Sequence, residues 1–383
     1  MIYSHLKKIG IMLKQKPSVI FYSLAVVASL VYIILTVNQQ HDWAGILLML
    51  FFGSLAMAFR SHPFLRTISF TVIIFAAVSM ALYYPQYFLD WCGFKLSGLI
   101  IPLIQLIMFG MGTSMSVKDF AAVVKTPKGV IIGVMSQFTI MPLLGYSLAS
   151  STNFAPEIAA GIVLIGCAPS GLASNVMAYL AKANLALSLT ITSITTLIAP
   201  FVTPVLMKIF AGALVEIDVL KMMWDIFKMI IIPIGAGLLF NKLLSGKSKW
   251  VDDSMPFVSM AGIACILVII TSAGRENLLK IGPALIGVVL IHNLFGYFLG
   301  YWSGRLFKLP ESDCRTIAIE VGMQNAGLAS GIAKEMGKIA TIGLAPAVFG
   351  PIMNITGSTL ASWWHSRLPK KDEQLMTEEL ITN

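Results

Sequence analysis

Long apolar stretches dominate the chain, and the short connections between them carry most of the charged residues. A helix needs about 17–25 predominantly apolar residues to cross a bilayer, because each residue adds only about 1.5 Å of length. The pattern therefore predicts twelve transmembrane helices. Their expected ranges are 18–37, 43–59, 67–84, 97–116, 129–148, 158–180, 185–210, 222–244, 257–273, 282–302, 316–334 and 342–364.

The composition agrees with this pattern. Of the 383 residues, 57% are hydrophobic and 12% are charged, whereas soluble domains contain about 25% charged residues. So few charges could not keep the surface of a soluble protein in water, which excludes a cytosolic enzyme, a disordered chain and a nucleic-acid-binding protein. We expect an all-α polytopic protein in the lipid bilayer of a cell (inner) membrane. The four cysteines have no metal-binding spacing.

Lysine and arginine are distributed unevenly between the two ends of the expected helices. An even number of helices places both termini on one side, and 19 of the 27 Lys and Arg residues fall on that side. Because positive residues accumulate on the cytoplasmic side, we expect both termini to be cytoplasmic. The net charge of +9 then reflects topology. No small-residue cleavage site follows the first expected helix, so we expect this helix to be retained.

A short motif recurs at a constant spacing. Ser170-Gly-Leu-Ala-Ser-Asn175 resembles Ala326-Gly-Leu-Ala-Ser-Gly331, which lies 156 residues later, and the third and eighth expected helices begin 155 residues apart. Each half then holds five helices, so the second half enters the membrane from the opposite side. This is the inverted repeat common in secondary transporters. Proline and glycine interrupt both helices that carry the motif, which predicts two crossed discontinuous helices.

Glu320 is a carboxylate inside the eleventh expected helix. A carboxylate at this depth costs about 2.5–3.5 kcal/mol on insertion scales, so it needs a partner. The residues leave three alternatives open: a cation ligand, a proton carrier, or a glutamate held by neighbouring hydroxyls; we favour the first two. Hydroxyl, amide and carboxylate oxygens suit a hard cation such as sodium. The candidate oxygen donors are Gln324, Ser174, Asn175, and Ser188 with Thr192 one turn apart.

Two further polar residues lie inside expected helices. His292, next to Asn293, is typical of a hydrogen-bonded packing residue, and Asn354 in the last helix is placed to reach the interrupted helices. The interrupted segments 170–172 and 325–327 are expected to expose helix N-termini with free N–H groups, which suit an anion. We therefore expect the organic anion to contact Ser170, Gly171, Leu172, Asn325, Ala326, Gly327 and Asn354.

Three segments resemble the bile acid:sodium symporter family. They are Met108-Phe-Gly-Met-Gly112, the Ser174-Asn175 pair after Gly166-Cys-Ala-Pro169, and Glu320-Val-Gly-Met-Gln-Asn325, within a similarity that runs from about Thr67 to Trp364. The resemblance implies ten helices in two inverted five-helix repeats, divided into a panel domain and a core domain. The implied division is 1–66 for a basic segment and an extra hairpin, 67–364 for the symporter unit, and 365–383 for a cytoplasmic tail. Panel helices would lie at about 67–117 and 222–273, and core helices at about 129–210 and 282–364.

The resemblance also implies two sodium sites. The residues of the family's first sodium site correspond in this chain to Ser174, Asn175, Ser188, Thr192 and Glu320. Those of its second sodium site correspond to Gln137, Glu320, Val321, Met323 and Gln324, where Val321 and Met323 contribute carbonyl oxygens. Gln137 is identified by the resemblance alone. Relatives that bind bile acids can have histidine before the asparagine of the last helix, where this chain has Met353-Asn354. Bile acid is therefore not implied as the substrate.

The leading hypothesis is a sodium-coupled symporter of an organic anion, either bile-acid-like or a small carboxylate of the pantoate or pyruvate type. It would work by alternating access with about two sodium ions per substrate. The alternative is a proton-coupled carrier that uses Glu320 alone. No HExxH or GxSxG motif is present, so we expect no enzyme activity and no cofactor besides sodium as the coupling ion. A channel would need a polar pore lining. We expect a monomer.

Overall fold

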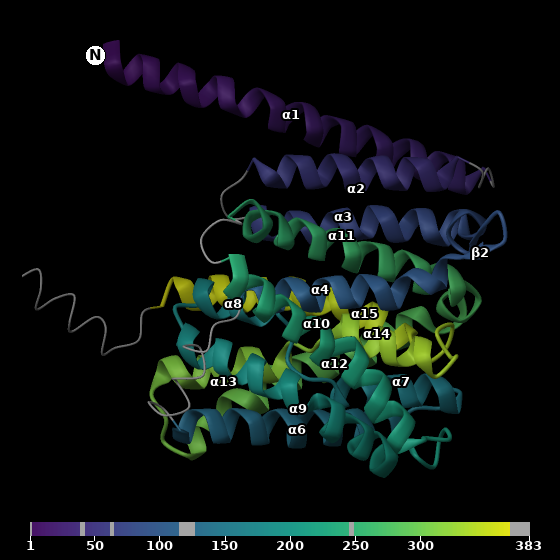
Figure 1. Cartoon of the computed structure of the whole chain (residues 1–383). Coiled ribbons are helices and arrows are strands. Elements are labelled where there is room, and N and C mark those ends of the chain that lie inside the picture. Colours follow the sequence, from purple (N-terminus) through teal and green to yellow (C-terminus); the bar gives the residue numbers. More distant parts are fainter. Residues whose placement is uncertain (1, 39–42, 62–64, 115–126, 245–248, 368–383) are drawn as a thin grey trace, which may run out of the picture. The chain divides into compact units, whose positions relative to one another are not determined.

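The computed structural model describes residues 2–38, 43–61, 65–114, 127–244 and 249–367, which contain fourteen α-helices and one two-stranded hairpin (Figure 1). The chain divides into two compact units. One comprises Met1–Leu96 with Leu267–Arg275, and the other comprises Ser97–Ile266 with Glu276–Asn383. The expected tail at 365–383 lies almost entirely outside the described residues.

The first unit is built on three consecutive helices: α1 (Ile2–Val37), α2 (Ala44–Arg60) and α3 (Arg66–Tyr83), with α2 packed against both neighbours. Polar contacts join them inside otherwise apolar faces. Tyr32 and Tyr83 share a hydroxyl–hydroxyl hydrogen bond of 3.0 Å, and Ser69 Oγ donates to the Ala56 carbonyl at 2.8 Å. Large apolar side chains of α1 are exposed, as expected of a helix that faces lipid.

A small β-hairpin, which the apolar pattern did not predict, follows α3. Strand β1 (Asp90–Trp91) pairs antiparallel with β2 (Phe94–Lys95). The two turn residues, Cys92 and Gly93, have positive φ angles of 52° and 87°, which suits a tight hairpin turn. Two strands of two residues are too short for a period-two pattern to appear in the sequence.

The second unit contains the remaining helices. In chain order they are α4 (Ile100–Ser114), α6 (Pro127–Ser150), α7 (Pro156–Cys167), α8 (Ala173–Leu180), α9 (Leu185–Ala211), α10 (Val219–Leu244), most of α11 (Lys249–Ala273), α12 (Arg275–Leu306), α13 (Glu311–Gly322), α14 (Ala326–Glu335) and α15 (Leu344–His365). Helices α6, α9 and α13 pack against one another. Their small and hydroxyl-bearing residues allow close approach in an apolar environment.

Every expected membrane segment falls on a helix or on a broken pair of helices. The segment expected at 158–180 is divided into α7 and α8, and the segment at 316–334 into α13 and α14. Within the described residues, six helices are long and apolar enough to cross a membrane, and four shorter helices are also apolar. The chain is thus an α-helical membrane protein with several apolar helices.

Candidate functional site

The two broken helices cross at their interruptions. Helix α7 ends at Cys167 and α13 ends at Gly322, and an extended segment follows each of them. These segments pair antiparallel, with Ser170 opposite Gln324. The crossing brings together two parts of the chain that lie about 150 residues apart, near the positions that the recurring motif predicts.

Main-chain hydrogen bonds close the crossing. Gly171 N donates to Met323 O at 2.9 Å, and Asn325 N donates to Pro169 O at 2.8 Å. A Cβ atom on Gly171 would lie 2.6 Å from the Gln324 carbonyl oxygen, so this approach requires glycine. The expectation that all N–H groups of these segments are free was therefore wrong, because the two broken segments satisfy part of each other's backbone.

The Glu320 carboxylate is completely buried beside the crossing. Four hydroxyl groups surround it. Ser174 Oγ and Ser188 Oγ donate to Oε1 at 2.7 and 2.5 Å, and Ser170 Oγ and Thr192 Oγ1 donate to Oε2 at 2.6 and 2.7 Å. No Lys or Arg of the described residues forms an ion pair with this carboxylate.

Asn175 completes the cluster through its side-chain oxygen. Its Oδ1 lies 2.8 Å from Ser188 Oγ and 3.2 Å from Thr192 Oγ1, and each of these hydroxyls has one proton to donate, either to Asn175 or to Glu320. All five residues carried over for a first sodium site therefore meet in one place. Ser170 joins them as well, although the sequence had suggested it only for the anion. Its position in the recurring motif was the available signal.

Contacts at the start of α9 explain why Ser188 and Thr192 face Glu320. Asn184 caps α9 by accepting from Leu187 N at 3.1 Å. It also binds α13 through Asp313 Oδ1 at 2.8 Å and through Thr316 Oγ1 at 2.9 Å. Since residues four apart share a helix face, the residues one turn deeper, Ser188 and Glu320, also meet.

A second group of polar atoms lies around Gln137 of α6. Its Nε2 donates to Ala168 O at 3.0 Å and to Gln324 Oε1 at 2.7 Å, and Gln324 Nε2 donates to Val321 O at 2.6 Å. The Gln137 Oε1 atom is buried and has no hydrogen-bond partner in the described structure. A buried acceptor without a donor is costly unless a ligand satisfies it. The structure thus brings Gln137, Val321 and Gln324 together, with Met323 in the crossing itself.

The remaining anion candidates are less closely arranged. Asn325 Oδ1 accepts from Leu328 N at 3.0 Å and so caps α14. Among the described residues, the backbone N–H groups of Leu172 and Gly327 have no acceptor, and both residues are half-buried. Asn354 is half-buried on α15 and forms no side-chain hydrogen bond with the cluster. The structure therefore does not join it to the Glu320 group.

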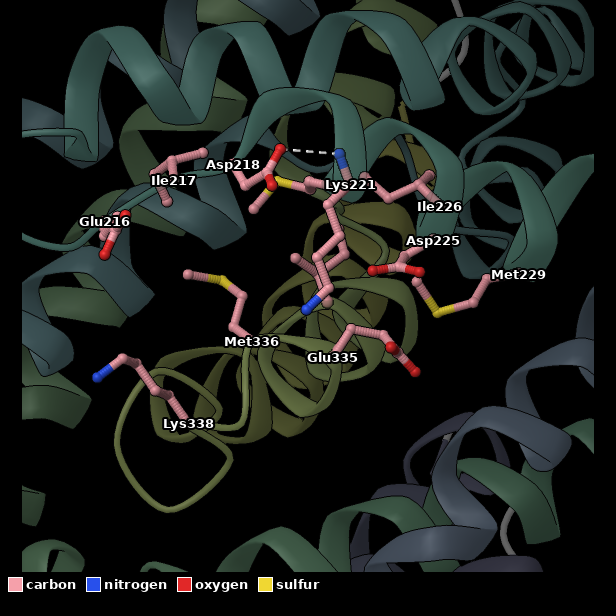
Figure 2. Close-up of a pocket in the computed structure, with 12 residues that line it drawn as sticks. Glu216, Ile217, Asp218, Lys221, Asp225, Ile226, Met229, Glu335, Met336 and Lys338 are labelled. Atoms are coloured by element: carbon pink, nitrogen blue, oxygen red, sulfur yellow. Dashed lines mark hydrogen bonds between the residues drawn. The ribbon is translucent and has the colours of Figure 1, made fainter.

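A separate cavity of about 280 Å³ lies where α10 begins and α14 ends. Figure 2 shows side chains of α10 on one side and Glu335, Met336 and Lys338 on the other. Two of its charged side chains form ion pairs, Asp225 with Lys228 at 2.8 Å and Lys338 with Glu157. The residues predicted for sodium and anion binding do not line this cavity.

One ion pair outside the expected membrane segments holds the core together. Glu157, in the first turn of α7, binds Lys338 and Thr341 in the connection after α14. The hydrogen bond from Lys338, with that from Thr341, lowers the pKa of the Glu157 carboxyl below its usual 4.5. A carboxyl whose pKa falls on folding stabilises the native state above its unfolded pKa, and this contribution is lost as the pH falls through the folded value.

We therefore expect Glu157→Gln to lower the melting temperature in detergent at pH 7 by a few degrees. The difference from wild type should shrink below about pH 4.5, where the wild-type carboxyl becomes protonated. Thermal unfolding between pH 3.5 and 8 measures it. Glu216→Gln serves as the control, because Glu216 is exposed and forms no ion pair with the residues that the structure describes. A difference that persists unchanged at the lowest pH would contradict this account.

The chemistry of these atoms favours a hard monovalent cation. No group of three or more His, Cys, Asp or Glu side chains that could hold a metal occurs in the described residues. The donors at Glu320 and Gln137 are instead hydroxyl, amide, carbonyl and carboxylate oxygens. Hydroxyl groups can rotate to turn their lone pairs toward a cation, and oxygen ligands suit hard ions.

Comparison with known proteins identifies the family of the chain. A family model described as "Sodium Bile acid symporter family" matches residues 101–281. The chain is 38% identical over 312 residues to the uncharacterized sodium-dependent transporter YocS of Bacillus subtilis (strain 168), covering 81% of this chain and 94% of that protein.

Two eukaryotic proteins are also similar. The probable chloroplastic sodium/metabolite cotransporter BASS1 of Oryza sativa subsp. japonica is 32% identical over 313 residues, covering 80% of this chain and 74% of that protein. The ileal sodium/bile acid cotransporter of Homo sapiens is 31% identical over 266 residues, covering 66% of this chain and 76% of that protein. The chain belongs to the sodium bile acid symporter family, a family of membrane transporters.

Proposed function

We propose that the protein is a sodium-coupled symporter of an organic anion and that Glu320 binds the coupling ions. The observation that carries the proposal is a fully buried carboxylate with four hydroxyl donors and no basic partner in the described structure. A buried charge of this kind needs a counter-ion. Sodium supplies it, and the surrounding oxygens replace the ion's water ligands.

The proton-coupled alternative rests on the same carboxylate. The hydroxyl groups around Glu320 can rotate, so they can donate to an ionised carboxylate or accept from a protonated one. The number of oxygen atoms favours a metal cation, because Asn175 Oδ1 also approaches Ser188 and Thr192 beside the carboxylate and is a further cation ligand in this proposal. The sodium dependence in the names of the relatives agrees with this choice.

A second sodium ion would lie beside Gln137. The unpartnered Oε1 of Gln137 is the amide ligand, and the carbonyls of Val321 and Met323 with Gln324 complete the set. Glu320 would then serve both ions. Two sodium ions that share one carboxylate repel each other, so each also needs neutral oxygen ligands. The backbone carbonyls that lack helical partners at a broken helix provide such ligands.

For the membrane arrangement we propose twelve spans with both termini cytoplasmic. The symporter unit at 67–364 would be an inverted repeat of five helices each, with a panel domain and a core domain divided as the resemblance implies. The helix pairs α7/α8 and α13/α14, which begin 155 residues apart, support this proposal. The first two helices would be an added hairpin, and the protein would act as a monomer.

The anion would bind where the half-helices begin. The N–H groups of Leu172 and Gly327 are available as donors there, and the helix dipoles favour negative charge. Asn354 lies on α15, which packs against α14, and would be a further polar contact for the anion. A small or amphipathic monocarboxylate fits these donors, because no basic side chain is placed in the crossing to bind a second negative charge.

Uptake into proteoliposomes tests the function. With two sodium ions per monovalent anion, one net positive charge enters in each cycle. A tenfold sodium gradient contributes about 1.4 kcal/mol per ion and 100 mV about 2.3 kcal/mol per charge. The sum of about 5 kcal/mol supports roughly 5,000-fold accumulation.

We expect labelled pyruvate, pantoate or cholate to enter when sodium is outside, and an inside-negative potential to speed that uptake. Choline outside in place of sodium, and a pH gradient without sodium, are the controls. Uptake driven equally well by the pH gradient would favour the proton-coupled carrier. Sodium-dependent uptake that ignores the membrane potential would contradict the stoichiometry of two ions.

A further inference from the structure

Two carbonyl groups at the end of α13 are proposed ligands of the second sodium ion. Their positions depend on the groups that donate hydrogen bonds to this part of the backbone. The donors to the carbonyls of Glu320, Val321 and Met323 come from the crossing itself; they are Ser170 Oγ (3.0 Å), Gln324 Nε2 (2.6 Å) and Gly171 N (2.9 Å). The Gly322 carbonyl lies between the two ligand carbonyls. Its donor is Asn293 Nδ2 of α12, at 2.8 Å.

Asn293 is itself fixed from a third helix. It is completely buried, and its Oδ1 accepts from Thr356 Oγ1 of α15 at 2.5 Å. The amide group therefore has a defined orientation, with the donor end toward α13 and the acceptor end toward α15. A buried amide whose nitrogen and oxygen are both hydrogen-bonded specifies one geometry for the groups that it joins.

The next turn of α12 packs against the same end of α13. Tyr297 lies against Gly322, where a Cβ atom would be 2.1 Å from Tyr297 Cδ1, so Gly322 must be glycine for α12 to approach this closely. The Tyr297 hydroxyl donates to Met353 O of α15 at 3.2 Å. Helix α12 thus supports the end of α13 both by packing and by a hydrogen bond.

Asn293 also corresponds to Gln137 in the internal repeat. The two residues are 156 positions apart, the same spacing as the recurring motif. Each side-chain amide donates to a backbone carbonyl at the helix break in the same half of the repeat. The acceptor is Ala168 O for Gln137 and Gly322 O for Asn293. They differ at the amide oxygen, because Gln137 Oε1 has no partner whereas Thr356 already binds Asn293 Oδ1.

We propose that Asn293 is a positioning residue for the second sodium ion. It does not contact the ion. It holds the Gly322 carbonyl and thereby the neighbouring carbonyls of Val321 and Met323 in the geometry that the ion requires. The difference at the amide oxygen explains why the pseudo-symmetric fold builds a cation ligand at Gln137 and a support at Asn293. The inference rests on the proposed sodium coupling and assigns to it a residue outside both sodium sites.

The test compares two asparagines on the same helix. Asn293→Leu removes the amide at the break with little change in volume. Asn277→Leu is the matched control, because Asn277 Nδ2 also donates to a carbonyl, Ala340 O at 3.1 Å, far along α12 from the crossing. The melting temperature of the purified full-length protein and the uptake of labelled pyruvate, pantoate or cholate are each measured as a function of sodium concentration.

We expect Asn293→Leu to raise the half-saturating sodium concentration about tenfold, the lower end of what losing an outer-shell partner costs a metal site. The Hill coefficient for sodium should fall from near two toward one. The apparent affinity for the anion at saturating sodium should stay within about twofold of wild type, and Asn277→Leu should titrate as wild type. A structural defect alone would not move the Hill coefficient selectively.

A second variant keeps the test decisive if Asn293→Leu does not fold. Thr356→Val removes the hydroxyl that orients Asn293 and keeps the side-chain shape; Thr359→Val on the same helix is its control, since Thr359 bonds only to Ile355 O one turn away. Thr356→Val should shift the sodium titration in the same direction. Sodium titrations of Asn293→Leu and Thr356→Val that match their controls would overturn the inference. A wild-type protein without any sodium dependence would refute the proposed function instead.

Discussion

Replacing Glu320 by glutamine is expected to abolish sodium-dependent uptake and the stabilisation of the purified protein by sodium. In the proposed arrangement one carboxylate balances both ions, so the substitution leaves both sites without a formal negative charge. Glutamine keeps the size of the side chain; its Oε1 can accept from one pair of hydroxyls, and its Nε2 can donate to the other pair, because hydroxyl oxygens also accept. The variant should therefore fold, which its elution profile and its melting temperature in sodium-free buffer can verify.

The matched control is Glu335→Gln, which changes the same residue type at the end of α14, the other half of the same broken helix. Glu335 lines the separate cavity and does not contact the hydroxyl cluster. We expect its sodium titration to match that of wild type. Full sodium-dependent uptake by Glu320→Gln would show that Glu320 is held by its hydroxyl partners for structural reasons only.

Removing the hydroxyl ligands of α9 is expected to have the second-largest effect. Ser188→Ala and Thr192→Val each delete one oxygen that touches both Glu320 and Asn175. A lost bond to a charged group costs about 1–3 kcal/mol, so each should raise the half-saturating sodium concentration by roughly 5- to 150-fold. Because the two hydroxyls bind the same partners, the double variant should cost less than the sum of the single ones.

Thr195→Val is the control for this series. Thr195 is a buried threonine of α9 that bonds only to carbonyls of its own helix, Ile191 O at 2.8 Å and Thr192 O at 3.2 Å. Its sodium titration should not change. If Ser188→Ala and Thr192→Val both titrate like Thr195→Val, α9 does not contribute to the sodium site.

The parts of the site that follow helical periodicity could be predicted from the sequence. Glu320 is conspicuous because it is a carboxylate within an apolar stretch, and the spacing of Ser188 and Thr192 places both on one face of α9. The two interruptions were visible because proline and glycine weaken a helix at equivalent places in a repeat. These signals are local, and local signals locate elements and faces well.

Contacts between distant segments could not be predicted in this way. Gln137 lies 183 residues from Glu320, and nothing in its surroundings along α6 marks it as a ligand. The pairing of Gly171 with Met323 uses backbone groups that any residue has, so the expectation of free N–H groups there was wrong. Asn293 is polar within a membrane helix, which indicates a partner, but only the packing of α12 against α13 identifies the Gly322 carbonyl.

Some polar side chains at the crossing are proposed ion ligands, and others hold the helices together without contacting an ion. This division links ion binding to the conformation of the crossing. The ligands proposed for the two ions come from α6, α8, α9 and both sides of the α13 break, so an ion that leaves removes the common counter-charge of several helices. The fixed supports are different. Asn184 ties α9 to α13, and Asn293 ties α13 to α12 and α15.

The most direct test of sodium coupling is equilibrium binding of radioactive sodium to the purified full-length protein. We predict saturable binding of about two sodium ions per chain, displaced by unlabelled sodium but not by potassium or choline, and absent from Glu320→Gln. Glu335→Gln should bind as wild type does. The account would be contradicted if wild type shows no saturable binding, or if Glu320→Gln binds sodium with the same affinity and number of ions.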